Sequence, residues 1–179
     1  MPQWSLSPLG HLQSLRHLSV SLSGYHWSRE LLRRDLGISW SELQRIDLEN
    51  STSLSSIEIL GDCALYLPDL TSLSIPIDAS ILPEYPVPAG RSSEPIRLVL
   101  ERYPISEESW PHIAAYIAAT YPKAEVSTIM LLMDELESDS EGEQEWWYEV
   151  AKMVPIMATV GWTERSLIHE GVVSVESEL

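Results

Sequence analysis

The sequence predicts an α/β fold: an irregular solenoid in which short parallel strands stack side by side, with helices or loops as return segments and a helical cap at the C-terminal end. Two observations predict it. Apolar residues recur at steps of three, three and two, which neither a continuous helix nor a continuous strand would produce. The same spacing returns twice at a nearly constant offset, so that Leu18, Ile46 and Leu73 occupy equivalent positions. An internal period of about 20 to 50 residues is typical of solenoid proteins.

Three segments carry this spacing: residues 12–20 (LQSLRHLSV), 40–48 (WSELQRIDL) and 67–75 (LPDLTSLSI). In each, the first two apolar residues suit a corner of the chain. The last two alternate with polar residues along a short strand, so both point inward. One such coil cannot bury its own apolar edge, and neighbouring coils must therefore stack. The apolar positions are Leu12, Leu15, Leu18 and Val20, then Trp40, Leu43, Ile46 and Leu48, then Leu67, Leu70, Leu73 and Ile75.

Two weaker copies follow, at less regular offsets. The first, EPIRLVLER, offers Leu98 and Leu100. The second, AEVSTIMLLM, is aligned so that Val126, Ile129 and Leu131 point inward, with Ile129 as the equivalent of Leu98. These two copies depend on the three before them, because their apolar residues match the spacing only in part.

The segments between the strands predict return helices and loops. Residues 106–121 place apolar side chains at three-four spacing, which predicts a core-facing helix with Ser106 or Ser109 as its cap and a proline after its end. Other expectations are a short helix at residues 28–37, a segment ambiguous between helix and strand at residues 55–68, and an extended proline-rich loop at residues 74–95.

An acidic run divides the chain. Residues 134–145 (DELESDSEGEQE) carry seven acids and no base, and like charges at this density keep a segment extended and solvated. We therefore expect the solenoid in residues 1–133, an acidic linker in residues 134–145 and a cap or tail in residues 146–179. Within the linker, Ser138 and Ser140 are each followed three positions later by an acid, which makes them candidate phosphorylation sites.

The cap is expected to begin with a helix. Trp147, Val150, Ala151 and Val154 share one helical face, and Pro155 is expected to kink or end the helix. Such a helix would cover the apolar end of the last coil. The alternative is an exposed aromatic patch that docks a peptide, formed by Trp146, Trp147 and Tyr148.

The repeats resemble a known family. Leu15-x-x-Leu18-x-Val20 and its two following copies match the Leu-x-x-Leu-x-Leu pattern of leucine-rich repeats, and the resemblance spans residues 9–132. Irregular repeats of unequal length, with proline-rich insertions and an acidic break, are similar to the substrate-binding half of fungal F-box proteins. That resemblance implies a module that selects targets for a ubiquitin ligase. It covers only the repeats, since no F-box is found before Leu9.

The leucine-rich-repeat resemblance also implies where a partner would bind. In such coils the outward residues of the strands line the concave side, and here they are mostly small and polar with mixed charge. That composition suits a protein partner of unknown identity better than a small-molecule pocket. It is equally compatible with plain solvated surface. The candidate partner-binding residues are His17, Ser19, Ser21, Arg45, Asp47, Glu49, Ser72, Ser74, Arg97, Glu101, Thr128 and Met130.

Composition narrows the partners and the compartment. A formal net charge of −16 argues against nucleic acid and anionic membrane surfaces as partners. Cys63 is the only cysteine, so we expect it to be a buried apolar residue, with no disulfide and no cysteine-based zinc site. Neither a signal peptide nor an apolar membrane span is present, which predicts an intracellular protein, cytoplasmic or nuclear.

The sequence favours a non-catalytic interaction module over an enzyme. It contains no nucleophile elbow, no phosphate-binding loop and no metal-binding histidine pair, so we expect no cofactor and no metal. Two alternatives remain. One is a small hydrolase whose serine and histidine are brought together by the fold. The other is an interaction protein that binds through its acidic tail.

Overall fold

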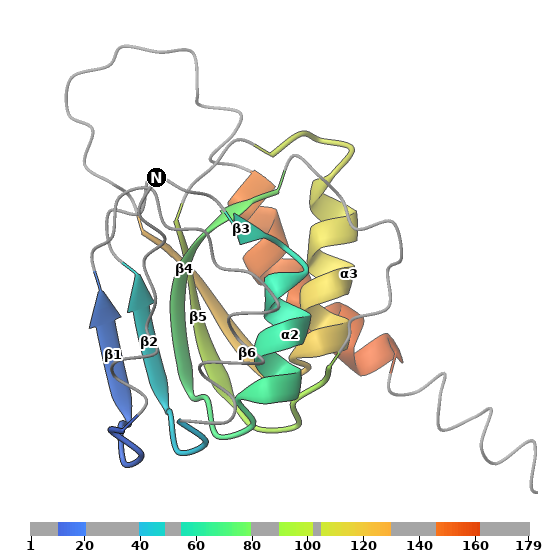
Figure 1. Cartoon of the computed structure of the whole chain (residues 1–179). Coiled ribbons are helices and arrows are strands. Elements are labelled where there is room, and N and C mark those ends of the chain that lie inside the picture. The colour runs from blue at the N-terminus through green and yellow to red at the C-terminus, as the bar shows by residue number, and fades with distance from the viewer. Residues whose placement is uncertain are drawn as a thin grey trace, which may run out of the picture.

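A computed structural model describes residues 11–20, 40–48, 55–79, 90–101, 105–129 and 146–161, with the backbone alone for residues 101, 128 and 129. These ranges form a sheet with helices packed on one of its faces (Figure 1). The expected helix at residues 28–37 lies outside them. The strands are β1 (His17–Val20), β2 (Arg45–Leu48), β3 (Ser55–Ser56), β4 (Ser72–Asp78), β5 (Ile96–Glu101) and β6 (Ala124–Ile129). The helices are α2 (Ile59–Tyr66), α3 (Trp110–Thr120) and a helix over residues 146–161.

The strands follow one another in the order β1-β2-β4-β5-β6, and every neighbouring pair is parallel. The two-residue strand β3 pairs with the far end of β4, also in parallel. The predicted α/β class with parallel strands is therefore confirmed. The three segments with the clearest repeat spacing lie side by side, as the stacking argument requires.

Equivalent positions of the repeats are in register across the sheet. Leu18 pairs with Ile46, Ile46 with Leu73, Leu73 with Leu98, and Leu98 with Val126. The last pairing corrects the alignment of the fifth copy, because Val126 and not Ile129 takes the position equivalent to Leu98. The predicted alignment of β6 with β5 was therefore wrong, and the shift is an odd number of residues. A shift by an odd number exchanges the two faces of a strand.

The corners before β1, β2 and β4 share one hydrogen-bonding pattern. Successive corners are joined through the backbone: Gln44 N–H donates to Arg16 O over 2.9 Å, and Thr71 N–H donates to Gln44 O over 2.8 Å. The Thr71 hydroxyl also donates to Gln44 O, over 3.1 Å. The corners thus stack on one another as the strands do. Each corner is closed by its own turn, from Leu15 N–H to Leu12 O (3.0 Å), from Leu43 N–H to Trp40 O (3.0 Å) and from Leu70 N–H to Leu67 O (3.2 Å).

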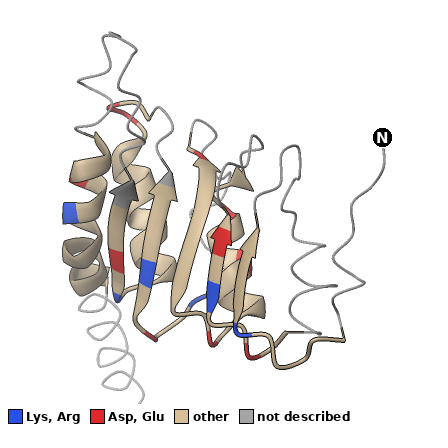
Figure 2. Ribbon diagram, turned by 90° about the vertical axis from the view of Figure 1, so that its left-hand side faces the viewer, with Lys and Arg blue, Asp and Glu red and all other residues tan. Residues whose placement is uncertain are grey.

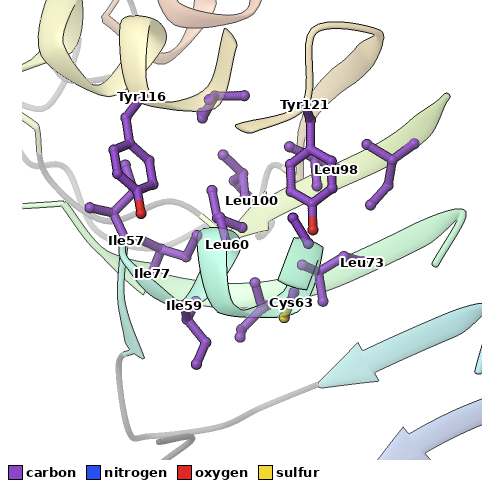
Figure 3. Packing of buried hydrophobic residues seen from close by; sticks show 14 of the residues in the cluster. Ile57, Ile59, Leu60, Cys63, Leu73, Ile77, Leu98, Leu100, Tyr116 and Tyr121 are labelled. Carbon is purple, nitrogen blue, oxygen red and sulfur yellow. The ribbon is translucent and has the colours of Figure 1, made fainter. Parts of the chain in front are cut away.

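The core fills the space between the sheet and the three helices. Its buried residues form a single cluster that includes the inward residues of β1, β2, β4 and β5. Figure 3 shows side chains from α2 and from α3 and its end meeting those of β4 and β5. Cys63 is among them and is 1% exposed, which confirms the expectation of a buried small residue.

The structure gives the secondary structure of the segments that connect the repeat strands. Residues 55–68 form a short strand followed by the helix α2. The helix predicted at residues 106–121 is α3, and the Ser106 hydroxyl accepts the Ser109 N–H over 3.2 Å in the turn before it. Tyr116 is also buried, at 3% exposed, which the predicted apolar stripe did not include.

Two prolines lie inside regular secondary structure. Of the two outcomes expected at Pro155, a kink or an end of the helix, the end does not occur. The helix over residues 146–161 continues past Pro155, which is exposed and leaves the buried face formed by Trp147, Val150 and Val154 uninterrupted. Pro76 lies inside β4, in a segment expected to be a loop. It is tolerated there because the ladder between β2 and β4 ends at the Asp47–Ser74 pair. A residue without an N–H fits where a strand has lost one neighbour.

Candidate functional site on the open face of the sheet

The face of the sheet opposite the helices is covered by no described element, and we call it the open face. Figure 2 looks onto it, with charged residues on several strands. Because side chains alternate along a strand, the residues between the buried apolar ones point to this face. On β5, for example, Ile96 and Leu98 are buried whereas Arg97 is exposed.

The register arranges the open-face residues in rows that cross the strands. The first row, nearest the start of the strands, pairs His17 with Arg45, Arg45 with Ser72, Ser72 with Arg97, and Arg97 with Glu125. Four of these five side chains are exposed, and Ser72 is half-buried. Neighbouring strands lie about 4.8 Å apart, so two arginines flank a serine within about 10 Å. This row could bind a carboxylate or a phosphate.

The second row is less charged. It runs through Ser19, Asp47, Ser74, Val99 and Ser127. At its centre Ser74 is only 8% exposed. The open face therefore offers a first row with two arginines and one glutamate, a second row with a single acid, and hydroxyl groups along both. Such a surface can contact an extended or flat polypeptide.

The structure brings together most of the residues predicted for this face. His17, Ser19, Arg45, Asp47, Ser72, Ser74 and Arg97 all lie on it in the two rows. The backbone of Glu101 lies in register with Pro76, one row further along. Five predicted residues lie outside the described ranges, namely Ser21, Glu49, Met130, Ser138 and Ser140.

The assignment of β6 to this face was wrong in phase. Thr128 is in register with Leu100, which belongs to the buried set, and not with an open-face residue. The open-face positions of β6 are instead those of Glu125 and Ser127. Sequence reasoning missed these two residues because it took Ile129 as the equivalent of Leu98. Repeating the offset that separates Leu18 from Ile46 would have led from Leu98 to Val126 and so to both of them.

Two cations on the open face form no ion pair with a described residue. Arg16 pairs with Glu42 (3.7 Å) and Lys152 with Glu149 (3.4 Å) in solvent-exposed ion pairs. Within the described part of the chain, neither Arg45 nor Arg97 makes an ion pair or a side-chain hydrogen bond. In so acidic a chain, unpaired arginines on a shared face are available to a partner.

The environment of Cys63 disfavours a role as a nucleophile. Burial raises the pKa of the Cys63 thiol to about 12, and the neighbouring Asp62 adds to the effect. A thiol with so high a pKa carries almost no thiolate at neutral pH and is a poor nucleophile. Among the described ranges, no histidine side chain hydrogen-bonds a serine, and no group of three metal-binding side chains occurs.

Tyr121 carries a buried hydroxyl that has no hydrogen-bond partner among the described residues. The residue is 1% exposed, and its hydroxyl points toward α2 (Figure 3). Burial raises the pKa of Tyr121 well above its usual value, and Cys63 and Tyr116 contribute further. A buried polar group that lacks a partner destabilises the folded state.

Replacing Tyr121 with phenylalanine is therefore expected to increase the free energy of unfolding, by about 1–3 kcal/mol. The change removes the unpaired hydroxyl and leaves the packing of the ring in place. Urea denaturation followed by circular dichroism measures the effect. Tyr148→Phe is the matched control, because Tyr148 is 67% exposed and should show no gain. A loss of stability in Tyr121→Phe would mean that the hydroxyl has a partner.

The aromatic residues at the start of the last helix serve packing rather than an exposed patch. Trp147 is 2% exposed. Trp146 stacks on Trp110 of α3, with ring centroids 6.3 Å apart and an interplanar angle of 7°. Only Tyr148 of the three is largely exposed. These contacts join the last helix to α3 and do not support a three-residue docking patch.

The chain matches no protein-family model, no curated protein and no solved structure. None of the helices in the described ranges is both long enough and apolar enough to span a bilayer.

Proposed function

We propose that this protein is a non-catalytic protein-interaction module that binds a partner polypeptide on the open face of its sheet. The observation that carries the proposal is the register, which gathers outward, mostly polar residues from five neighbouring strands into rows that cross the sheet. An interaction surface built on strands is rigid, so its side chains are presented without a large ordering cost.

The proposed architecture behind this surface is an irregular solenoid similar to leucine-rich repeats. Three features support it: the recurring corner turns, the hydrogen bonds that join successive corners, and the alignment of Leu18, Ile46 and Leu73. The helices lie on one side of the molecule and the sheet of strands forms the other side, which fits the same architecture (Figure 1). In a stacked arrangement each coil contributes the same outward positions, which produces a repeated binding surface.

The finer proposal is that the module recognises substrates for an F-box-type ubiquitin ligase. Its support is the resemblance of the repeats to the substrate-binding half of fungal F-box proteins. In that role the open face would hold the target while a separate F-box recruits the ligase. The partner would be an intracellular protein, in agreement with the expectation of a cytoplasmic or nuclear location.

Site-specific cross-linking tests the binding face. A photo-reactive amino acid placed at Ser72, in the centre of the first row, should cross-link the partner. The same group at Leu65, which is 49% exposed on α2, is the matched control on the opposite side and should not. Reversing two charges, in Arg45→Glu with Arg97→Glu, should reduce cross-linking from position 72 by at least about tenfold.

Both arginines are exposed, so the double variant should keep its unfolding free energy within about 0.5 kcal/mol of the original. Equal cross-linking from positions 72 and 65 would contradict binding on the open face. The ligase role is tested separately, by fusing an F-box to the chain and measuring ubiquitin conjugation of the cross-linked partner. Conjugation that survives the double charge reversal would argue against recognition by this face.

The competing acidic-tail hypothesis needs an experiment that leaves the core intact. Deleting everything after residue 133 would remove Trp147, a buried member of the core. Replacing the acids of residues 134–145 with their amides avoids that loss. The acidic-tail hypothesis predicts that this neutralised chain no longer binds the partner, whereas the Arg45→Glu, Arg97→Glu variant still binds it. That pair of results would identify the tail, and not the open face, as the binding element.

A further inference from the structure

The described part of the chain contains six of the eleven lysines and arginines, and four of these six form no ion pair with another described residue. Arg45 and Arg97 lie on the open face. The other two, Arg91 and Lys123, lie elsewhere, at the wall of a cavity. Two cations without an ion pair to any described residue thus lie at one cavity, in a chain with a net charge of −16.

The cavity has a volume of about 360 Å³ and opens to solvent. This volume falls in the range of small-molecule sites, about 300–1,000 Å³. Among the described residues, three segments contribute to its wall: the residues that lead into β5, the turn between α3 and β6, and the last turn of the helix over residues 146–161. None of these described lining residues is acidic. The lining residues are Arg91, Ser93, Pro122, Lys123, Ala158 and Thr159.

Backbone contacts hold these walls in place without any ligand. Gly90 lies directly against α2, where an added Cβ would come within 2.6 Å of Gly61 O. Ser92 is buried, and its N–H donates to Thr120 O at the end of α3 over 2.9 Å. Its neighbours Arg91 and Ser93 are exposed and line the cavity. The backbone that carries these donor groups is thus positioned in advance.

The two cations are not needed to neutralise the end of α3. Cationic side chains near a helix C-terminus often satisfy its last carbonyl groups. Here the chain does so itself: Ile117 O accepts the Tyr121 N–H over 2.7 Å, and Thr120 O accepts the Ser92 N–H. Neither Arg91 nor Lys123 makes a hydrogen bond or ion pair with any described residue.

The cavity combines donors with an apolar surface. Arg91, Lys123 and the hydroxyl of Ser93 can all donate to an anion. The Thr159 hydroxyl already donates to Pro155 O over 2.9 Å, so Thr159 adds little to anion binding. Pro122 and Ala158 provide apolar wall. Cationic and hydroxyl donors at an apolar wall favour a ligand with one anionic end and an apolar body.

We propose that this cavity is a second binding site, separate from the open face, for a small organic anion in which a carboxylate or phosphate is attached to an apolar group. The anionic end contacts Arg91 and Lys123, and the apolar body packs on Pro122 and Ala158. The remote acids of the chain oppose binding only weakly at physiological salt, where charges more than about 8 Å apart are largely screened.

Binding of three probes to the full chain tests the site at an ionic strength of about 0.15 M. Phenyl phosphate has both required parts, phenol lacks the charge, and inorganic phosphate lacks the apolar body. Amide chemical shifts measured during titration give the affinity and the location. We expect saturable binding of phenyl phosphate, with shifts at Ser93, Lys123 and Ala158, and at least about threefold weaker binding of the other two probes. Benzoate, run in parallel, distinguishes a carboxylate ligand from a phosphate ligand.

Variants that each remove one positive charge identify the side chains that bind the anion. Arg91→Gln and Lys123→Gln should each weaken binding by about three- to fivefold, as expected for partly exposed ion pairs. Lys152→Gln is the matched control, because Lys152 already pairs with Glu149 and does not line the cavity. Its affinity should not change. Arg91 and Lys123 are exposed, and circular dichroism checks that both variants fold.

Three results would overturn the proposal. The first is that neither phenyl phosphate nor benzoate binds. The second is that phenol binds as tightly as phenyl phosphate. The third is that affinity is unchanged in Arg91→Gln and Lys123→Gln, or falls equally in Lys152→Gln. None of these outcomes bears on partner binding at the open face, because the two sites share no residue.

Discussion

Replacing Trp147 with alanine is expected to lower the free energy of unfolding by about 3–5 kcal/mol, the usual cost of deleting a buried tryptophan side chain. Trp147 is 2% exposed and belongs to the same core cluster as the inward residues of the strands. The change would leave a cavity between the last helix and the rest of the core. Chemical denaturation followed by circular dichroism measures the loss.

The control is the adjacent residue. Tyr148→Ala removes an aromatic side chain that is 67% exposed, and its effect should stay within about 0.5 kcal/mol. Because the last helix shares the core, Trp147→Ala should unfold in one transition at a lower denaturant concentration. Similar losses in the two variants, or separate melting of the helix, would show that residues 146–161 do not belong to the same cooperative unit.

Replacing Leu73 with alanine is expected to cost about 2–5 kcal/mol. Leu73 is 0% exposed, lies in the middle of the sheet, and is in register with Ile46 on one side and Leu98 on the other. It thus tests the central assumption about the repeats, that their equivalent positions form one buried row. The same denaturation experiment measures the loss of stability.

Ser72→Ala is the neighbouring control for this prediction. Ser72 is half-buried on the open face, and loss of its hydroxyl should change stability by no more than about 0.5 kcal/mol. The two substitutions differ by one position along β4 and by the face of the sheet. Comparable losses at both positions would contradict the assignment of buried and open faces on this strand.

Much of the sheet could be predicted because its signal is local. The repeated spacing placed the strands that contain Leu18, Ile46 and Leu73, and the observed register aligns these residues with one another. Each coil of the chain therefore has nearly the same length from one buried position to its equivalent in the next coil. The same reasoning found most of the open face, since alternation along a strand follows once its buried residues are known.

The fifth copy shows where that reasoning failed. AEVSTIMLLM contains apolar residues at both even and odd positions, so the sequence permits either phase. The wrong phase placed Thr128 on the open face and omitted Glu125 and Ser127. Pairing with β5 resolves the ambiguity, because the row that continues Leu98 reaches Val126. A strand with apolar residues on both faces does not specify its own register.

The cavity with Arg91 and Lys123 could not have been found from the sequence. The two residues lie far apart along the chain and belong to segments without any shared motif. They meet at one cavity because Ser92 hydrogen-bonds the end of α3 and because the last helix ends beside the turn that contains Lys123. No periodic pattern of residues in the sequence predicts that these three segments of the chain come together.

By itself the sequence determined the period of the chain, the parallel α/β class, the core-facing helix α3 and the buried state of Cys63. These follow from the spacing of apolar residues, which acts over short stretches of chain. Only the tertiary structure decided the phase of β6, the strand position of Pro76 and the continuation of the last helix past Pro155. Each of these depends on which surface a segment packs against, because burial against a neighbour outweighs the local preference of a single residue.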